Sequence, residues 1–478
     1  MRHELSTLQI LLLTLFAGCW LSTALGAQTN DDVNAGLQFN FSTPGARSLG
    51  MGGAFLALAD DATAAYTNSG GLTNLTVGGS EISVEFRQWN FSNVFPDQGH
   101  IAGPPSGIGV DTVPGLQGGS GESRAAGFSF LSFGYVLPHG WTLAIYRQQL
   151  AKFEAQAKAQ GFLVGAERGK LFRVFPTRSR LNLAVENYGL SAGYRLVQSD
   201  TFGVVSLGLG LSYYRSQISS RTERFFRGPE EGDTFGRRQP GGFFGVADYL
   251  GDNVNNVILQ EGQDTDWGLN LGALWKIGPS EIWSLGAAYR RGPRLASNAR
   301  FVYGPAAERA DPRNRNGSVD PGVGGKALLH VPDVYGLGVA WSPAQGKARV
   351  TLDYDRVRYS QMIEGLTNVL LQSEGSFQRS DYRLSDVGEI HLGVEYVFLA
   401  IDPRAVCSVR FGAWRDPHHA LEYIGANPVL RGRFRPGDDQ NHLSAGLGLV
   451  VGENFQVDVA YDYSNLVRTF SLSLVKFF

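Results

Sequence analysis

Two pairs of carboxylates stand at even spacing in the second half of the chain: Asp353 with Asp355, and Asp458 with Asp462. Side chains two or four residues apart on an extended strand point to the same side, so each pair shares a face. Paired carboxylates can perform general acid–base chemistry. Carboxylates that line a polar interior and are balanced by arginine or lysine are much commoner, and we favour that interpretation for both pairs.

The histidines form no complete catalytic or metal-binding set in the sequence. His391 and Glu395 share a face four residues apart, but the neighbouring sequence supplies no third metal ligand. His418 and His419 are adjacent, so their side chains point apart and are poorly placed to hold one ion. The sequence has no GxSxG nucleophile elbow, because Gly189–Gly193 matches that spacing only inside the strand predicted at 181–197, and the HExxH, P-loop and CxxC motifs are absent. We therefore expect no catalytic residue, no metal site and no cofactor.

The elements that would position these side chains are β-strands with one apolar face. In residues 267–277 the apolar face carries Trp267, Leu269, Leu271, Ala273, Trp275 and Ile277, and the other face is mostly glycine and polar. Similar alternation recurs at 203–215, 389–398 and 455–463. Trp267 and Trp275 lie ~26 Å apart along a strand at ~3.3 Å per residue. A tilt of 35–45° reduces this to ~20 Å, close to the ~25 Å apolar band that aromatic girdles bound in membrane barrels.

The composition agrees with a membrane barrel. The 478 residues include 62 glycines, and charged residues make up 18%, below the roughly 25% of soluble domains. A net charge of −2 gives no electrostatic footprint for nucleic acid. Beyond the N-terminus there is no apolar run long enough for a helical membrane span. We therefore predict an all-β protein, a transmembrane antiparallel β-barrel rather than a soluble sandwich.

Residues 80–478 are predicted to form about fourteen strands, an even number as in bacterial barrels. The connections alternate between short and long, with one exception, the short last connection at 465–468. The long connections are predicted at 90–125, 151–180, 216–266, 292–332, 359–388 and 415–441. Short periplasmic turns and long extracellular loops produce this alternation. We expect the first strand to run outward and the last one, 469–478, to return to the periplasm.

Residues 1–27 have the layout of a secretory signal peptide. Arg2 and His3 precede an apolar core at 8–16, and small residues follow at 24–27. We expect cleavage after Gly26 or Ala27. Lipidation at Cys19 is the alternative. Cleavage leaves Cys407 as a single cysteine, which excludes an intramolecular disulfide.

Residues 28–79 do not alternate, and small residues dominate from 45 to 68. A barrel of about fourteen strands has a wide lumen, which a compact Gly/Ala-rich segment can fill. We therefore predict an N-terminal luminal plug, or hatch, over 28–79; a disordered linker is the alternative. The run Gly50-Met51-Gly52-Gly53 is not a dinucleotide-binding fingerprint, because no apolar strand precedes it.

The run from Gly45 to Leu72 closely resembles the plug signature of the FadL-type outer-membrane transporters of long-chain fatty acids. The residues of this hatch motif are Gly45, Gly50, Gly52, Gly53, Asp60, Asp61 and Asn68. Segments 331–339, 352–360, 410–417 and 443–449 resemble the family more loosely. The family continues Asn-Pro-Ala-Gly-Leu where this chain has Asn68-Ser69-Gly70-Gly71-Leu72, which leaves the local conformation of the plug open.

The resemblance implies a fourteen-strand barrel of the outer membrane with an N-terminal hatch. It implies passage of hydrophobic molecules, long-chain fatty acids or aromatic hydrocarbons, with sideways release into the outer leaflet as one route. Burial of apolar surface favours uptake by passive diffusion without an energy source. The expected partners are outer-membrane lipids, a hydrophobic small molecule and the barrel assembly machinery, with no nucleic acid.

The long predicted loops carry apolar side chains. Those in 216–266 include Phe225, Phe226, Phe243, Phe244, Ile258 and Leu259. Exposed apolar clusters mark binding grooves for apolar ligands, so these residues are candidates for ligand capture. Packing of loop against loop over the barrel mouth explains them equally well.

Two other functions stay open on the sequence. The chain also resembles PorV-type barrels, which share the plug motif and serve a protein secretion system as interaction or shuttle components. Such a protein would bind a secreted partner through its long loops and take up no ligand. An outer-membrane lipid-modifying enzyme would need a histidine beside lipid, and His391 is predicted to face inward.

Overall fold

The computed structural model describes most of the chain from residue 41 onward. The described residues are 41, 43–75, 79–101, 115–159, 162–165, 171–174, 177–225, 254–303, 323–343, 347–365, 379–399, 405–426, 431, 434, 436–452 and 454–478. The predicted signal peptide lies outside them, as does part of the predicted hatch. Among these residues no helix is long and apolar enough to cross a membrane.

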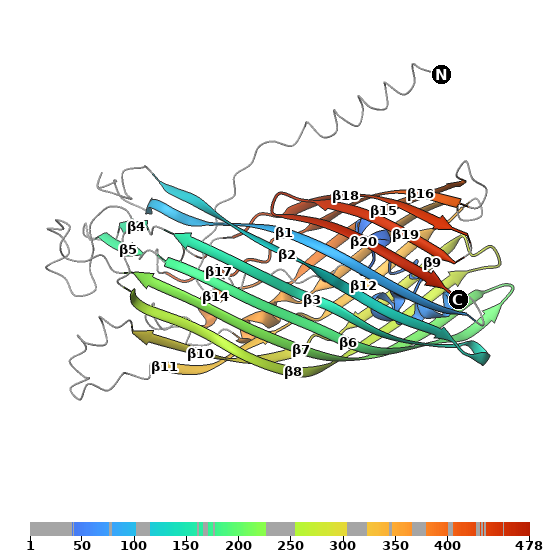
Figure 1. Cartoon of the computed structure of the whole chain (residues 1–478), viewed down its shortest axis with the longest axis horizontal. Helices are drawn as coiled ribbons and strands as arrows, with labels where there is room; N and C mark the ends of the chain where they lie inside the picture. The colour runs from blue at the N-terminus through green and yellow to red at the C-terminus, as the bar shows by residue number, and fades with distance from the viewer. Residues whose placement is uncertain are drawn as a thin grey trace, which may run out of the picture.

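In the described part of the chain, fourteen antiparallel strands form one closed barrel (Figure 1). They are β1 (Ser80–Ile101), β2 (Leu116–Val136), β3 (Trp141–Ala159), β6 (Thr177–Ser199), β7 (Gly203–Phe225), β8 (Val254–Ile277), β9 (Trp283–Arg290) continued by β10 (Arg294–Tyr303), β11 (Val323–His330) continued by β12 (Val334–Trp341), β13 (Ala348–Val357), β15 (Val387–Leu399), β16 (Ala405–Asp416), β18 (Gln440–Val451), β19 (Phe455–Tyr463) and β20 (Val467–Phe477). The barrel closes where β1 pairs with β20, from Glu81 opposite Phe477 to Phe91 opposite Val467. The predicted fold class is confirmed.

Smaller elements decorate this barrel. β4 (Phe162–Gly165) and β5 (Leu171–Val174) form a hairpin, and β4 pairs in parallel with the end of β1. β14 (Tyr382–Arg383) pairs with β17 (Glu422–Tyr423). The helical elements are α3 (Ala46–Gly50), α4 (Ala64–Thr67), η1 (Ser69–Asn74), η3 (Pro138–Gly140), η7 (Tyr359–Gly365) and η9 (Arg379–Asp381). Short turns connect the strands at the end where β20 finishes, which is the periplasmic end in barrels of this type.

Several strands extend far beyond their predicted outer ends. Residues 90–101, 151–159 and 254–266 continue β1, β3 and β8, although alternation predicted loops there. Above the membrane the outer face of a strand meets water, so the apolar outer face that revealed the strands is lost. For the same reason Phe225, Ile258 and Leu259 lie in β7 and β8 rather than in a loop.

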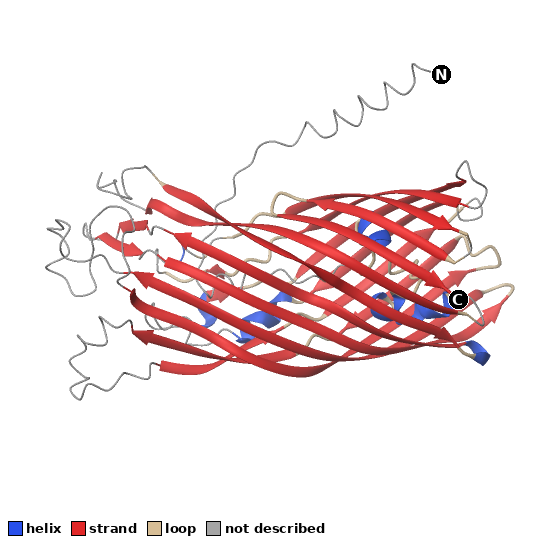
Figure 2. Cartoon of the chain, viewed as in Figure 1, coloured by secondary structure: helices blue, strands red, loops and turns tan. Residues whose placement is uncertain are grey.

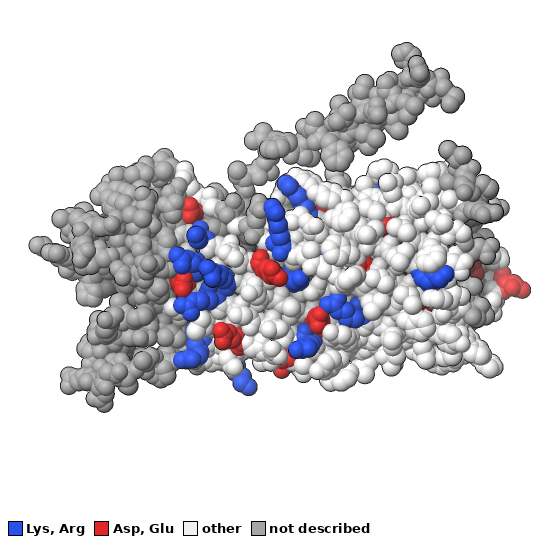
Figure 3. All heavy atoms as spheres, in the orientation of Figure 1, with Lys and Arg blue, Asp and Glu red and all other residues white. Residues whose placement is uncertain are grey.

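The apolar face of the strands points away from the lumen. Trp267 and Leu271 are exposed on the outside, with 56% of the surface of Trp267 accessible. On the opposite face, a Cβ at Gly272 would lie 2.4 Å from Oδ1 of Asn68, inside the barrel. Tyr213 packs on Trp267 toward the extracellular end, and Trp283 packs near Trp341 at the periplasmic end. Figure 3 shows the charged residues of one face gathered toward the extracellular end and much of the other half uncharged.

Residues 43–75, here called the luminal segment, lie inside the barrel (Figure 2). Strands around the barrel present inward glycines where the backbone of this segment passes. These glycines include Gly193, Gly208, Gly272, Gly286, Gly338, Gly393, Gly412 and Gly446. A Cβ at Gly412 would lie 2.0 Å from the amide nitrogen of Gly52, and one at Gly286 would lie 2.3 Å from the carbonyl oxygen of Leu56. The abundance of glycine thus lets the segment pack directly on the strands.

Toward the extracellular end the lumen is apolar rather than polar. There Leu181, Leu183 and Val185 of β6 are buried inside, together with η7 and the β14–β17 pair. This vestibule cluster comprises Phe41, Leu150, Ala151, Leu181, Leu183, Val185, Tyr214, Ile218, Leu295, Val331, Val334, Val357, Tyr359, Met362, Ile363, Tyr382, Leu384, Val387, Leu421, Tyr423 and Phe434. The apolar face of β6 therefore switches sides, because Leu190, nearer the periplasm, is exposed on the outside.

Candidate functional site

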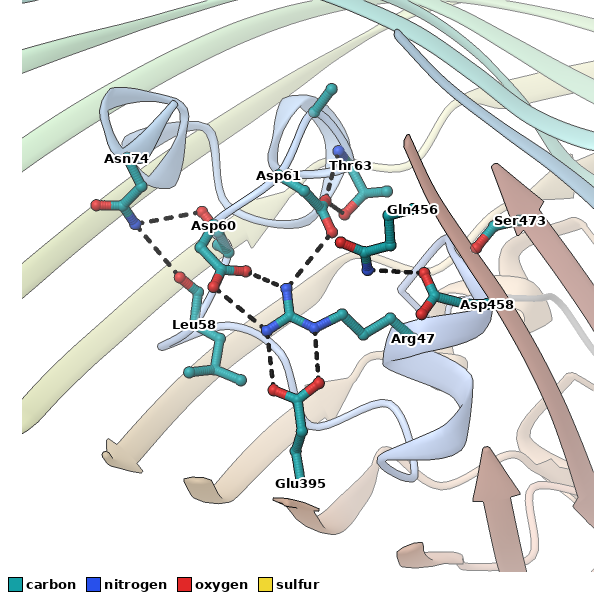
Figure 4. A network of polar contacts seen from close by, with 12 residues as sticks. Arg47, Leu58, Asp60, Asp61, Thr63, Asn74, Glu395, Gln456, Asp458 and Ser473 are labelled. Atoms are coloured by element: carbon teal, nitrogen blue, oxygen red, sulfur yellow. Dashed lines mark hydrogen bonds and ion pairs between the residues drawn. The ribbon is translucent and has the colours of Figure 1, made fainter. Parts of the chain in front are cut away.

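Arg47 of α3 joins the luminal segment to the barrel (Figure 4). Its guanidinium donates two hydrogen bonds of 3.1 Å to Glu395 of β15 and one of 2.6 Å to Asp60 of the same segment. Glu395 also accepts from Arg410 of β16 at 2.7 Å, and Arg410 donates to Asp458 of β19 at 2.7 Å. All of these charges except the partly exposed Asp60 are buried, so each buried charge depends on its partners for compensation.

The two aspartates of the hatch motif experience opposite electrostatic effects. Burial raises the pKa of Asp60, but the charges of Arg47 and Arg349 outweigh it and leave that pKa below its usual value. Burial and the charge of Asp60 raise the pKa of Asp61 to about 6. Asp61 accepts a hydrogen bond of 2.9 Å from the backbone amide of Thr63. Asp60 therefore acts as an ionised partner of Arg47, whereas Asp61 orders the turn before α4.

The glycines of the hatch motif serve close approach and positive φ angles. Gly45 precedes α3 with φ 96°, and Gly52 and Gly53 have φ 66° and 82°. The amide of Gly52 donates to Ser444 Oγ at 2.9 Å, and the carbonyl of Gly52 lies 2.7 Å from His391 Nδ1. A Cβ at Gly50 would lie 3.0 Å from Cα of Gly446. The motif thus encodes contact with the barrel.

Asp353 and Asn68 hold the middle and the end of the luminal segment. Asp353 of β13 accepts hydrogen bonds of 2.7 and 2.8 Å from the amides of Phe55 and Leu56. The Asn68 side chain donates to the carbonyls of Leu56 and Ala273 at 2.8 and 2.9 Å. Asp353, one of the candidate acid–base residues, thus anchors the luminal segment.

A cavity of about 110 Å³ lies between the luminal segment and the vestibule cluster. Glycines 52 and 53 contribute from the luminal segment, and Leu150 and Tyr359 contribute from the vestibule cluster. Aromatic side chains form one part of its lining: Phe41, Trp89, Phe91, Phe153, Tyr359 and Trp414. Titratable side chains form another part: Lys152, which is partly exposed, and Asp355, Glu389, His391, Asp416, His442 and Asp462.

Three rings are stacked along the polar part of this cavity. Trp414 lies between His391, at 5.1 Å between ring centroids, and His442, at 3.8 Å. Asp462 fixes the stack, because its carboxylate accepts hydrogen bonds of 2.7 Å from His442 Nδ1 and 3.1 Å from Trp414 Nε1. The stack therefore presents ordered polar ring edges beside an aromatic surface.

Beside the cavity, the hydrogen-bond ladder between β2 and β3 is interrupted. Pairing holds from Val136 down to Phe130 opposite Gln148, and the next pair is Ser123 opposite Ala155. Within β2, residues 124–129 pair only with β1. Within β3, residues 149–154 pair only with β6. We call the stretch between these two segments the seam.

The seam coincides with irregularities in both strands. The register of β1 and β2 shifts at Glu85/Phe86, and that of β3 and β6 shifts at Gln149/Ala151. Such bulges turn strands away from regular pairing. The seam borders the cavity directly, because its residues Ala125, Leu150, Ala151, Lys152 and Phe153 are among the lining residues.

Long cationic side chains donate hydrogen bonds to backbone carbonyls along the seam. Lys152 Nζ donates to the carbonyl of Ala126 at 3.0 Å, and Arg147 donates to the carbonyl of Phe128. Arg147 is itself paired with Glu186 of β6. The seam is therefore closed by side chains rather than by a backbone ladder.

The remaining candidate residues have structural contacts. His419 stacks on Tyr359 at 3.9 Å between centroids and lies 3.4 Å from Asp416, whereas His418 lies 3.8 Å from Glu422. Within the described residues no three metal-ligating side chains are grouped to hold an ion.

The predicted ligand-capture residues are not brought together. Ile258 is fully buried against Ala299 and Ala327, and Leu259 follows it in β8. Phe225 ends β7, and Phe226, Phe243 and Phe244 lie outside the described residues.

Sequence reasoning missed the residues that define the cavity and the network. Arg47 stood within the hatch motif and Trp414 within a family-like strand, but neither was singled out. Trp89 and His442 also escaped notice. Inward positions that carry a charge or a large ring on an otherwise Gly/Ser-rich face were the available signal.

A closed barrel with an apolar outer band, an occupied lumen and an internal cavity defines an outer-membrane channel protein. A family model described as outer membrane protein transport protein (OMPP1/FadL/TodX) matches residues 179–469. The chain belongs to this family, whose members are transport channels and not enzymes. The comparison with curated proteins gives no match.

Solved structures share the fold at low sequence identity. A FadL homologue of Pseudomonas aeruginosa aligns with a TM-score of 0.55 and 13% identity over 92% of this chain and 98% of its own. The monoaromatic hydrocarbon channel CymD gives 0.52 and 15% over 92% and 99%. The toluene transporter TbuX of Ralstonia pickettii gives 0.50 and 14% over 92% and 98%.

Proposed function

We propose that this channel carries small aromatic hydrocarbons from the extracellular side into the outer leaflet by passive diffusion. The observation that carries the proposal is the contact between the aromatic-lined cavity and the seam. A ligand would enter through the vestibule cluster, rest in the cavity and leave between β2 and β3. The luminal segment lies on the periplasmic side of this path and acts as the hatch.

The size of the cavity favours single rings over long chains. Its volume is about 110 Å³, the same order as the ~150 Å³ of an apolar protein cavity that holds one benzene. A long-chain fatty acid would extend far outside it. The structures of a monoaromatic hydrocarbon channel and of a toluene transporter with this fold support the same choice.

Passive movement follows from graded burial. Transfer of apolar surface out of water is favourable by about 25 cal/mol per Å². The vestibule cluster, the cavity and the lipid beyond the seam each offer an apolar environment, so no coupled energy source is required.

Uptake into liposomes tests the proposal. Proteoliposomes with the full chain should take up toluene faster than protein-free liposomes and faster than they take up palmitate. A Gly127→Cys/Gln149→Cys variant with Cys407→Ser should be locked across the seam by a short bifunctional methanethiosulfonate reagent, because the Gln149 side chain already reaches to 3.7 Å from a Cβ at Gly127.

The reduced form of the same variant is the matched control. The cross-link should slow toluene uptake, and its reduction should restore it. Equal uptake in both forms would contradict the lateral path. No uptake by wild-type protein would contradict transport altogether and favour the PorV-type role, which capture of a secreted protein on the loops would then test.

A further inference from the structure

The polar part of the cavity has hydrogen-bonding groups that a hydrocarbon ligand would not use. Toluene has no hydrogen-bonding group, so it needs no titratable lining. Among the described lining residues, however, four are carboxylates: Asp355, Glu389, Asp416 and Asp462. Burial of such groups is costly unless something compensates them, so their partners indicate what the cavity accepts.

Three of these carboxylates already have a histidine partner. Asp462 accepts from His442 at 2.7 Å, Glu389 lies 3.4 Å from His391, and Asp416 lies 3.4 Å from His419. Asp355 has no such histidine, and its Oδ1 is buried without a hydrogen-bond partner; Oδ1 of Asp416 also lacks a hydrogen bond, although His419 lies 3.4 Å away. An unpartnered carboxylate oxygen is a hydrogen-bond acceptor.

His442 supplies a second acceptor. Its side chain is 2% exposed, and Nδ1 is held by the Asp462 carboxylate. A carboxylate only accepts, so Nδ1 carries the proton, and in the neutral ring Nε2 is then an acceptor. Nε2 has no partner, and its residue lines the cavity. Two acceptors without donors therefore belong to one cavity.

The cavity lacks a matching site for an anion. Among the described lining residues, Lys152 is the single lysine, and no arginine is present. Its amine already donates to the carbonyl of Ala126. A ligand carboxylate would lie among four carboxyl groups, three of which already have the neighbouring histidines as partners. Aromatic side chains at the same time offer a surface for a flat ring.

From this pattern we infer that the cavity selects single-ring aromatics bearing one hydrogen-bond donor, a hydroxyl or an amino group, and rejects aromatic carboxylates. This inference rests on the proposed function and narrows its ligand class. The ring lies among Trp89, Phe91 and Phe153, and the donor satisfies Asp355 or His442.

Toluene, phenol and aniline test the inference because they are nearly isosteric. Binding to the wild-type protein in lipid nanodiscs is measured by calorimetry, with benzoate as the anionic probe and empty nanodiscs as the reference for partition into lipid. Phenol and aniline should exceed toluene in affinity by about tenfold after that correction, the effect of one good hydrogen bond. Benzoate should show no binding above the reference.

Two variants locate the effect. His442→Phe and Asp355→Leu should each lower the phenol-to-toluene affinity ratio severalfold and leave toluene binding intact, which also shows that the cavity is folded. Asp200→Asn, in an exposed turn at the periplasmic end, is the matched control and should change neither.

The outcomes are distinguishable. If benzoate binds as well as phenol, or if wild-type protein binds toluene as tightly as phenol and aniline, this inference is wrong although the proposed function stands. An unchanged ratio in both folded variants would overturn it as well. If none of the four compounds binds, the proposed function itself fails.

Discussion

Lys152 of β3 donates a hydrogen bond of 3.0 Å to the carbonyl oxygen of Ala126 in β2, where the two strands have no backbone ladder. A side chain thus performs the task that a backbone amide performs elsewhere in the barrel. Breaking a ladder of backbone hydrogen bonds requires a concerted movement of two strands. A lysine can leave its carbonyl by rotating side-chain bonds alone.

Removal of this lysine should loosen the seam. We expect Lys152→Met to raise amide hydrogen exchange in residues 124–129 and to speed toluene uptake about two- to fivefold, because one exposed hydrogen bond contributes about 0.5–1 kcal/mol. Exchange measured by mass spectrometry checks this. Lys276→Met, at the periplasmic end of β8, should change neither quantity; equal effects in the two variants would contradict a specific role for Lys152.

Loss of Arg47 should release the luminal segment. Arg47→Met leaves Glu395 and Asp60 without their buried partner, and loss of one member of a buried pair costs about 3–5 kcal/mol. We expect a lower unfolding temperature and a higher conductance for small ions in planar bilayers. The control is Arg221→Met, which breaks an exposed pair with Glu223 and should shift neither. A conductance that stays at the wild-type value would show that other contacts suffice to hold the segment.

A single methyl group on the inner face should disturb the packing of the luminal segment. In Gly412→Ala the new Cβ would lie 2.0 Å from the Gly52 nitrogen, so the segment must move. We expect a loss of stability of about 1–3 kcal/mol, typical of overpacking. Gly127→Ala is the control, because its Cβ would meet its neighbour at 3.7 Å. Thermal unfolding followed by gel mobility compares them, and equal midpoints would refute close packing at Gly412.

Stability should depend on the titration of Asp61. The pKa of Asp61 is raised to about 6 in the folded protein, above that of an unfolded aspartate. Its favourable contribution is therefore complete below about pH 4 and is lost as the pH rises through about 6. We compare Asp61→Asn with wild type at pH 5 and at pH 7.5. As the pH rises from the first value to the second, the stability of the variant relative to wild type should increase by on the order of 1–3 kcal/mol.

Asp60→Asn separates this effect from a general loss of charge. The pKa of Asp60 is lowered, so Asp60 is ionised at both pH values and its removal should destabilise the protein about equally at each. Unfolding midpoints at the two pH values provide the measurement. An Asp61→Asn variant whose advantage does not change with pH would contradict the titration.

The membrane-spanning part of the fold was predictable because lipid requires an apolar outer face on every strand. Trp267 and Leu271 alternate with Gly268 and Gly272, and the structure places them outside and inside as expected. Within the predicted hatch motif, Gly50, Gly52, Gly53 and Asn68 contact the strands, whereas the role of the motif as a hatch stays a prediction. The alternating segments predicted the strand number, and the alternation of short and long connections predicted the orientation of the strands.

The outer part of the barrel and the cavity were not predictable in the same way. In β6, Leu183 and Val185 face inward while Leu190 faces outward, so one strand follows two opposite rules. The cavity depends on His391, Trp414 and His442, which come from β15, β16 and β18. Their stacking depends on the register between strands, which no local pattern encodes.

The reversal of polarity along β6 has a consequence for how a solute travels. Near its extracellular end the barrel is built like a soluble protein, greasy within and wetted without, and at membrane depth it is built the other way round. On the path proposed above, an apolar solute that leaves water at the mouth would pass the head-group layer inside a protein interior. It would leave through the seam and would not have to cross the polar surface of the leaflet.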